Sequence, residues 1–267
     1  MSERVKIDLT DGVADVRMCR ADKMNAIDAA MFTELQEAGR ALAQDRQVRA
    51  VVLSGEGRAF CAGLDMDSFA AMAGPRSGGG ADPKLFERSQ SGANRAQLAA
   101  WIWQELPVPV IAAVHGVAYG GGLQIALGAD LRLVAPDARL SVMEVKWGLV
   151  PDMSGTQTLR RLVRLDVAKE LTFTGRVVTG EEAVALGLAT RTSAKPREDA
   201  LALAREIAGK SPDAVRAAKR LLQESWQGSV ADGLRLEEEL QRSLIGKPNQ
   251  LEAVRANFEK RAPKFAD

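Results

Sequence analysis

The sequence predicts a layered α/β fold that is followed by a helical C-terminal region. Up to about Val163, short β-branched runs alternate with helical patterns, which is typical of layered α/β folds. Beyond that point the remaining patterns are helical. Apolar residues make up 46% of the 267 residues, enough for a sizeable core. We expect a core domain over residues 1–195 and a helical region over residues 196–267.

The chain opens with a predicted β-hairpin. Val5 to Leu9 and Val13 to Met18 each alternate apolar and polar residues, and Asp11-Gly12 between them is a hairpin turn signal. Asp28 then caps a predicted helix, whose apolar face has helical spacing: Met31, Leu35, Ala38 and Leu42. Arg49 to Ser54 predicts a buried strand that enters a glycine turn.

The middle of the chain centres on the stretch from Val108 to Leu127. Before it, Gly74 to Gly92 is rich in Gly, Ser and Pro and predicts a mobile surface segment, either a lid or a tolerated loop insertion. Ala93 to Glu105 predicts a helix. In the stretch itself, an apolar strand enters three glycines, Gly120 to Gly122, and a helical pattern follows directly.

Two further strands and several helices complete the prediction. The strands are Asp130–Ala135 and Leu140–Met143, and Glu144–Asp152 is expected to be a loop. The expected helices cover Ser154–Val163, Glu181–Leu186, a segment opened by Pro196, a segment opened by Ser211-Pro212, Val230–Leu244 and Gln250–Arg261.

Composition excludes several classes of protein. The net charge of +1, from 36 basic and 35 acidic residues, argues against nucleic acid as a partner. Cys19 and Cys61 are too few for a disulfide framework or a zinc cluster. The first residues lack a signal-peptide core, and no apolar run reaches the ~18 residues of a membrane span. We expect a cytoplasmic protein with no membrane partner.

Two glycine-rich turns follow two of the strands, at Ala59–Leu64 and Gly120–Gly122. Neither matches a dinucleotide fingerprint or a P-loop. If they lie side by side, two backbone N–H groups converge on one oxygen, which is an oxyanion hole suited to a thioester carbonyl that becomes an enolate. The alternative is two tight strand–helix turns that bind nothing.

Four blocks of sequence, in this order, resemble the crotonase (enoyl-CoA hydratase/isomerase) superfamily. They are RAFCAGLD, PVIAAVHGVAYGGG, EVKWGLVPD with GTQTLRRL, and TFTGRVVTGEEAVALGLA. The resemblance covers about Val5 to Lys264 and implies a ββα spiral core with C-terminal helices that associate into a homotrimer or hexamer. It also implies acyl-CoA thioester substrates, no metal, and no cofactor other than the CoA that the substrate carries.

The resemblance assigns roles to individual positions. The oxyanion donors would be the N–H groups of Leu64 and Gly121, and Glu144 falls on the second catalytic glutamate of the family. CoA would lie near Cys61 and Ala62, with its adenine close to the segment from Arg20 to Ala26. Lys23 and Lys260 are candidates for phosphate contacts, with ordinary solvated charges as the alternative.

Gln124 is where the sequence departs from the hydratase pattern, in which a glutamate stands two residues beyond the glycines. An amide neither takes nor gives a proton near neutral pH, so Gln124 cannot be a general acid or base. One carboxylate suffices to move a proton between carbons, whereas hydration normally uses two. The family's isomerases with one glutamate are therefore the better match.

Asp152 is a second candidate acid, eight residues beyond Glu144. Dienoyl-CoA isomerases carry an aspartate at what looks like the same position, which would let Asp152 reprotonate a distant carbon. The alternative is an N-cap for the helix that begins near Ser154.

Other functions stay open at this point. A true hydratase would use Glu144 while Gln124 holds the water, a thioester hydrolase would release free thiol, and a non-catalytic homologue would only bind acyl-CoA. His115, the only histidine, lies in an apolar strand and is expected to be structural, as is Cys61, which has no second histidine to activate it.

Overall fold

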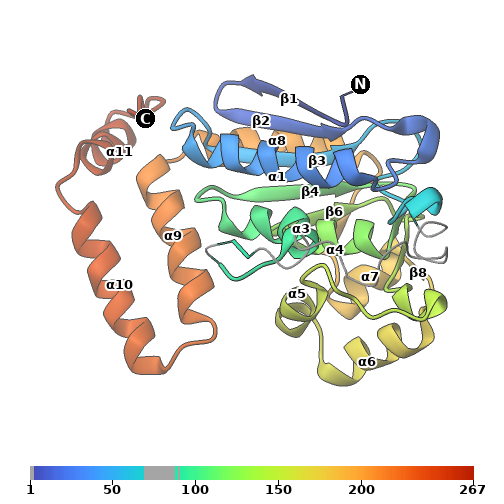
Figure 1. Ribbon diagram of the computed structural model, residues 1–267. Helices are drawn as coiled ribbons and strands as arrows, with labels where there is room; N and C mark the ends of the chain where they lie inside the picture. Colours follow the sequence, from blue (N-terminus) through green and yellow to red (C-terminus); the bar gives the residue numbers. More distant parts are fainter. Residues whose placement is uncertain (1–2, 69–87, 90) are drawn as a thin grey trace.

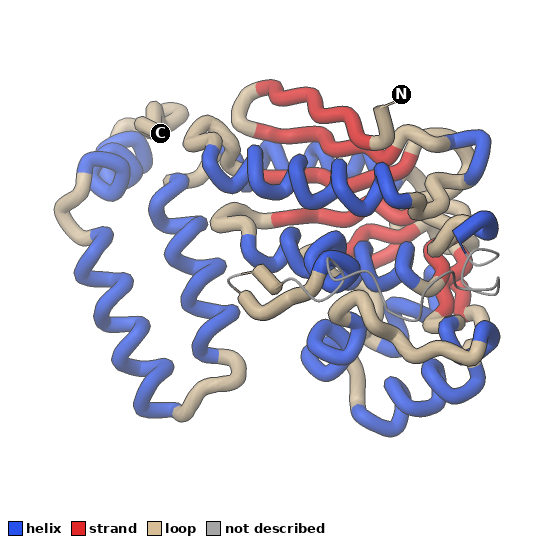
Figure 2. Tube along the Cα trace, in the orientation of Figure 1, coloured by secondary structure: helices blue, strands red, loops and turns tan. Residues whose placement is uncertain are grey.

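The computed structural model describes residues 3–68, 88–89 and 91–267. Most of the segment Gly74 to Gly92 therefore lies outside the described residues. Figures 1 and 2 show a layered α/β body at one side and C-terminal helices that extend from it at the other. Within the described ranges, no helix is both long and apolar enough to cross a membrane.

A six-stranded sheet forms the centre of the body, with the order β1-β2-β3-β4-β6-β9. β1 pairs with β2 antiparallel, and all the other pairs are parallel. The strands are β1 Val5–Thr10, β2 Val13–Met18, β3 Ala50–Gly55, β4 Val110–Val114, β6 Leu131–Val134 and β9 Arg191–Thr192. The predicted hairpin is confirmed, because Asp11 and Gly12 both have the positive φ, 50° and 79°, that a two-residue hairpin turn favours.

A second, three-stranded sheet has the order β5-β7-β8, formed by Val117–Tyr119, Arg139–Ser141 and Val178–Thr179. The chain passes from β4 into β5 and then into helix α4, and from β6 into β7 and then into a short 3-10 helix. These repeated ββα units confirm the expected mixed α/β architecture. Strands β5, β8 and β9 are too short for a period of two to reveal them in the sequence.

Helices cover both faces of the large sheet. In the part of the chain that the structure describes, the helices are α1 Ala29–Gln44, α3 Arg95–Glu105, α4 Gly121–Leu127, α5 Gly155–Leu162, α6 Leu165–Thr174, α7 Gly180–Leu186, α8 Pro196–Ala208, α9 Pro212–Ser225, α10 Val230–Leu244 and α11 Pro248–Phe258, with 3-10 helices η1 Ala21–Lys23 and η3 Glu144–Trp147. The segment predicted as a loop from Glu144 thus begins as a 3-10 helix.

Alternation along β3 shows how the layers form. Val51 and Leu53 face a core shared with α1, α3 and α4, whereas Ala50 and Val52 face α8. α8 presents a stripe of alanines, Ala200, Ala204 and Ala208, which lets it lie close against the sheet. α8 is therefore part of the layered body, and the helices that extend away from it in Figure 1 are α9, α10 and α11.

Caps fix where the two helices on the other face begin. Asp28 accepts a hydrogen bond from the N–H of Met31 (2.8 Å) and starts α1 as predicted. Asn94 and Gln97 form a reciprocal capping box at the start of α3. Both helices then bury apolar faces against the sheet and α4.

Candidate active site

The glycine triplet lies where β5 ends and α4 begins. Gly120 has a φ of 51° and is the N-cap of α4, with its own N–H donated to the carbonyl of Ser141 (2.9 Å). Gly121 is the first residue of the helix, so its N–H has no acceptor one turn earlier. None of the hydrogen bonds among the described residues uses that N–H, which is therefore available to an oxygen outside the helix.

The other glycine-rich turn, Ala59–Leu64, lies directly beside this helix start. Cys61 donates to Val117 (3.0 Å) and accepts from Tyr119 (3.1 Å), which adds the turn to the edge of β5. Gly63 has a φ of 89°, and a Cβ there would lie 2.6 Å from the carbonyl oxygen of Tyr119 and 3.8 Å from the nitrogen of Gly121. The two turns that the sequence separates by more than 50 residues are thus neighbours.

Leu64 offers the second unengaged N–H. Ile27 donates to Gly63 (2.8 Å) and accepts from Asp65 (3.0 Å), so the peptide groups on either side of Leu64 face Ile27. The N–H of Leu64 then points away from Ile27, and no hydrogen bond of the described residues uses it. The arrangement supplies two backbone donors from adjacent turns, as an oxyanion hole requires.

Glu144 and Gln124 form the polar centre of the site. Gln124 lies on α4 and Glu144 begins η3, and the Nε2 of Gln124 donates to Oε1 of Glu144 over 2.5 Å. Both residues are buried, at 2% and 8% exposure. Oε2 of Glu144 is buried and accepts no hydrogen bond from the described residues. A Cβ at Gly120 would lie 3.4 Å from Oε1, so the carboxylate lies against the glycine triplet.

Two backbone N–H groups fix the orientation of the Gln124 amide. Its Oε1 accepts from the N–H of Met153 (2.9 Å) and from that of Gly155 (2.9 Å) at the start of α5. Ser154 between them has a φ of 65°, and this left-handed turn lets both N–H groups face one oxygen. Because those donors need an acceptor, the amide nitrogen must face Glu144.

The surroundings of Glu144 raise the pKa of its carboxyl group above the ordinary 4.5. Burial is the largest cause, and the nearby charge of Asp152 adds to it, whereas hydrogen bonds from the backbone and Gln124 act in the opposite direction. A buried carboxylate with a raised pKa and an unpartnered oxygen is suited to accept a proton from a substrate carbon.

Asp152 does not cap helix α5, which was one of the two roles that the sequence suggested for it. The N-cap of α5 is Ser154, which makes no side-chain capping bond, so the interpretation of Asp152 as the N-cap is wrong. Partial burial of its carboxyl group raises the pKa of Asp152, although the residue as a whole is exposed. Asp152 is therefore a titratable group near Glu144 that does not act as the N-cap of α5.

The segments expected to hold CoA lie together. Ala62 donates to the carbonyl of Met24 (2.9 Å), and the buried Asn25 side chain donates to the carbonyls of Ala59 and Phe60 (2.8 and 3.1 Å). These bonds place Cys61 and Ala62 beside the segment that ends at Ala26 and carries the exposed Lys23. The thiol of Cys61 donates to Asn25 (3.1 Å), and burial raises its pKa to about 12, so it is no nucleophile.

Lys260 is the one predicted site residue that the fold leaves apart. It lies two residues beyond the end of α11, which is on the opposite side of the molecule from β8 in Figure 1. Within one chain it therefore cannot reach the segments expected to hold CoA.

The only histidine in the sequence, His115, contacts the backbone. The Nε2 of His115 lies 2.9 Å from the carbonyl oxygen of Gly57, away from Glu144 on the chain's course from β4 to β5. No group of three or more His, Cys, Asp or Glu side chains suited to a metal is present in the part of the chain that the structure describes.

The backbone donors of Met153 and Gly155 were not identified from the sequence, and neither was an ion pair of Arg20 with Asp65 next to Leu64. Gly155 was the sequence signal that could have revealed the two backbone donors, since a Cβ at this position would lie 2.5 Å from Oε1 of Gln124. Nothing in the spacing of Arg20 and Asp65 reveals their contact.

Sequence comparison finds related proteins over nearly the whole chain. A family model described as enoyl-CoA hydratase/isomerase matches residues 8–267. "Enoyl-CoA hydratase domain-containing protein 2, mitochondrial" of Mus musculus is 36% identical over 261 residues, which cover 95% of this chain and 84% of that protein. "Methylglutaconyl-CoA hydratase, mitochondrial" of the same species is 33% identical over 261 residues, covering 95% and 79%.

Solved structures show the same fold. The crystal structure of an enoyl-CoA hydratase from Bacillus anthracis has a TM-score of 0.86 at 30% identity and covers 98% of both chains. That of an enoyl-CoA hydratase from Mycobacterium smegmatis has a TM-score of 0.85 at 31% identity, covering 98% of this chain and 99% of the other.

Proposed function

Since this chain belongs to the enoyl-CoA hydratase/isomerase family and is an enzyme of that family, we propose that it moves a double bond within an enoyl-CoA thioester. The thioester oxygen lies between the N–H groups of Leu64 and Gly121, neither of which has an acceptor among the residues that the structure describes. Glu144 is the base, and the CoA portion lies along Cys61–Ala62 with Lys23 near its phosphates. No metal or separate cofactor takes part.

The observation that carries the proposal is the pairing of Glu144 with an amide. Oε1 of Glu144 accepts from Gln124, whose own oxygen is occupied by two backbone N–H groups. Beside Glu144, whose Oε2 accepts no hydrogen bond from the described residues, the site thus holds an amide at the place where a two-carboxylate addition of water needs a second acid or base.

The reaction balances with this set of groups. For a 3-enoyl-CoA, Glu144 takes the proton from C2, and the electron pair enters the C1–C2 bond as the thioester oxygen becomes an enolate. Protonation at C4 by Glu144 or Asp152 then moves the double bond to C2–C3. The hydrogen bonds from the two backbone N–H groups strengthen as negative charge grows on the oxygen, which lowers the barrier to removing the proton from C2.

The experiment compares two substrates on the wild type and Glu144→Gln. Isomerisation of 3-hexenoyl-CoA by the wild type should exceed hydration of crotonyl-CoA, and the variant should lose about 10²–10⁴-fold of the isomerisation rate. Equal rates of isomerisation in the two proteins would remove Glu144 as the base. Tight binding of both thioesters without turnover by the wild type would instead identify an acyl-CoA binder.

Hydration is the second candidate, because the related proteins from Mus musculus, Bacillus anthracis and Mycobacterium smegmatis carry hydratase in their names. The Gln124 nitrogen has a second hydrogen, which would hold a water beside Glu144. Faster hydration of crotonyl-CoA than isomerisation of 3-hexenoyl-CoA would favour this candidate, and release of free thiol would show hydrolysis.

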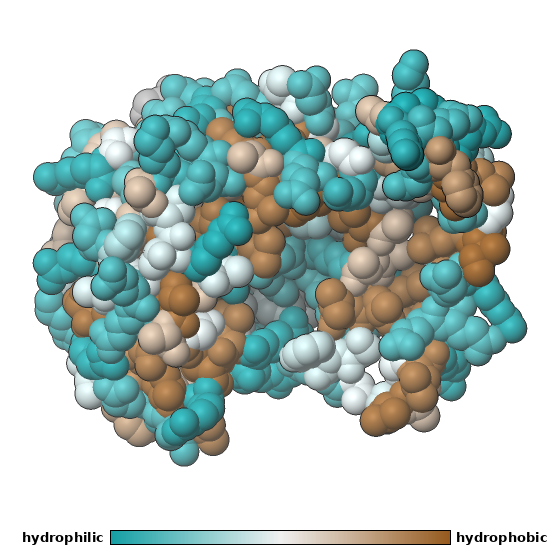
Figure 3. Space-filling view, turned by 180° about the vertical axis from the view of Figure 1, so that it is seen from behind, coloured by the Kyte–Doolittle hydropathy of each residue, from teal (hydrophilic) through white to brown (hydrophobic). Residues whose placement is uncertain are grey.

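The C-terminal helices are the proposed site of association into a homotrimer or hexamer. Large apolar side chains on α9 to α11 and just beyond them are exposed, among them Trp226 at 72% and Phe258 at 85%. Apolar surface gathers on the side of the molecule that carries these helices, beside a hollow that separates them from the body (Figure 3). Association would cover this surface and bring Lys260 to a neighbouring subunit. Sedimentation equilibrium tests it, and a monomeric mass at micromolar concentration would refute it.

A further inference from the structure

Arg20 joins two segments that lie on either side of the proposed oxyanion donor Leu64. Its Nη1 donates to the carbonyl of Ala26 (3.0 Å) and forms an ion pair with the carboxylate of Asp65. The two side chains are largely buried, at 13% and 5% exposure. One guanidinium therefore bonds both to the residue before Ile27 and to the residue after Leu64.

The bonded segments are the ones whose pairing directs the N–H of Leu64. Ile27 donates to Gly63 and accepts from Asp65, as described above. Arg20 adds a third link between the same two segments, from Ala26 to the side chain of Asp65, beside a turn that Gly63, with its positive φ, would otherwise leave easy to rotate. The cross-link thus restrains the peptide group that carries the donor.

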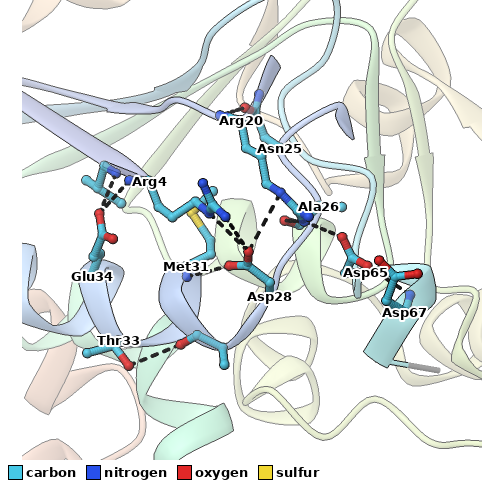
Figure 4. Close-up of polar contacts among 12 residues, drawn as sticks. Arg4, Arg20, Asn25, Ala26, Asp28, Met31, Thr33, Glu34, Asp65 and Asp67 are labelled. Carbon is cyan, nitrogen blue, oxygen red and sulfur yellow. Dashed lines mark hydrogen bonds and ion pairs between the residues drawn. The ribbon is translucent and has the colours of Figure 1, made fainter. Parts of the chain in front are cut away.

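A chain of polar contacts anchors the cross-link to α1 (Figure 4). The Nε of Arg20 lies 3.7 Å from Oδ2 of Asp28, and this oxygen also accepts from Arg4 (2.8 Å), while Oδ1 of Asp28 accepts from the N–H of Met31 and so caps α1. The other oxygen of Asp65 accepts from the N–H of Asp67 (2.8 Å). Burial alone would raise the pKa of Asp65, but the hydrogen bonds from the N–H of Asp67 and from Arg20 lower it, so the carboxylate of Asp65 stays ionised.

We propose that Arg20 and Asp65 are positioning residues, which hold the N–H of Leu64 in line with that of Gly121 and so set the strength of the oxyanion hole. The proposal rests on the proposed function of this site. Because Asp65 neutralises Arg20, the pair acts through geometry and adds no net charge near the enolate. A displacement of about 1 Å at such a donor costs up to ~10²-fold in rate.

The test uses Arg20→Lys and Asp65→Asn. Lysine keeps the charge but loses the planar fork that reaches two acceptors, and asparagine keeps the shape but loses the ion pair. We expect kcat for 3-hexenoyl-CoA to fall about tenfold in the first and ~10²-fold in the second, with KM and the acid limb of the pH profile unchanged. Arg17→Lys is the matched control, since Arg17 is as buried and is paired with Asp15 and Asp8 on β1 and β2.

A spectroscopic readout separates geometry from loss of folded protein. Hexanoyl-CoA labelled with carbon-13 at the carbonyl has no double bond to move, and its C=O stretch falls in frequency when two donors bind the oxygen. The wild type and Arg17→Lys should show the full decrease, and Arg20→Lys and Asp65→Asn a smaller one. Because only ligand bound in the site shows the shifted band, unfolded protein does not contribute to it.

The outcomes distinguish the two proposals. A full decrease in frequency and unchanged kcat in both variants, with only the midpoint of thermal unfolding lowered, would make the pair purely structural and overturn this inference. Binding of hexanoyl-CoA to the wild type without any decrease would overturn the oxyanion hole itself. If Asp65→Asn does not fold, Arg20→Lys decides the question alone.

Discussion

The amide nitrogen of Gln124 donates to Oε1 of Glu144 over 2.5 Å, and both side chains are buried. The amide oxygen is held by Met153 and Gly155, so the amide cannot turn round without leaving two N–H groups unpaired. This pair therefore contains one ionisable carboxylate at a fixed place, and most of the testable properties of the site follow from it.

The pH dependence of catalysis should report the raised pKa of Glu144. A base acts in its ionised form, so kcat/KM for 3-hexenoyl-CoA should fall as the pH decreases through a value above 4.5. Stability should show the opposite sign: the folded state holds this proton more tightly than the unfolded state, so the wild type loses unfolding free energy as the pH rises from about 4.5 towards neutrality. Glu144→Gln should lack this loss, and urea titrations of both proteins at several pH values measure it. If the difference in unfolding free energy between the two proteins did not change with pH, the raised pKa assigned to the buried Glu144 would be wrong.

Gln124→Glu should convert the pair into two carboxylates that share a proton. One oxygen of the new side chain would accept from Met153 and Gly155, and the other would face Oε1 of Glu144. Like charges this close cannot both be ionised, so one pKa rises strongly. We expect the ratio of crotonyl-CoA hydration to 3-hexenoyl-CoA isomerisation to rise at least about tenfold, with the acid limb at higher pH. Gln124→Met is the control, and an unchanged ratio in Gln124→Glu would show that residue 124 does not choose the reaction.

Asp152→Asn should lower the kinetic pKa of Glu144, because the charge of Asp152 is one cause of its increase. If Asp152 also returns a proton to the substrate, as proposed, kcat should fall about 10²-fold while KM stays the same. The pH profile of kcat and kcat/KM separates the two effects. A shifted profile with unchanged kcat would leave Asp152 only an electrostatic role.

Gly122→Ala should weaken both stability and catalysis, although alanine is the better helix former. A Cβ at this position would lie 2.4 Å from the carbonyl oxygen of Cys61, so the two donor turns would have to separate. We expect a loss of about 1–3 kcal/mol of unfolding free energy and about tenfold in kcat. Gly209→Ala at the end of α8, where the nearest atom would be 3.4 Å away, is the control. Equal kcat in both variants would show that the turns can separate without harm.

Lys219→Met should weaken the attachment of α9 to the body and so lower the free energy of unfolding. Lys219 is buried, and its ammonium donates to Asp130 (2.8 Å) and to the carbonyls of Val108 and Trp103 (2.9 and 3.3 Å). Removing one partner of a buried ion pair typically costs about 3–5 kcal/mol. Urea unfolding measures the loss, and the exposed Lys210→Met provides the baseline. A loss no larger than that of Lys210→Met would show that α9 is held by packing alone.

Local signals in the sequence determined much of the fold. The hairpin at Asp11-Gly12 and the cap at Asp28 appear in the structure where the sequence predicts them, whereas the single apolar strand predicted before the glycine triplet is divided at His115 and Gly116 into β4 and β5, which belong to different sheets. The hairpin and the cap each depend on neighbours within about four residues, which is the range over which turn chemistry, capping and periodicity act. The interpretation of Asp152 as a cap failed because a left-handed Ser154 moved the helix start.

The features of the site also fall into those that the sequence determines locally and those that depend on the tertiary structure. The sequence by itself determined the glycine turns, the single carboxylate at Glu144 and its departure at Gln124, because these are single residue types within local motifs. Only the tertiary structure decided that Gly63 lies against Gly121, that Met153 and Gly155 fix the Gln124 amide, and that Arg20 reaches Asp65. Each of these contacts joins segments at least 29 residues apart. The packing of the whole chain sets such distances, and no local pattern in the sequence encodes them.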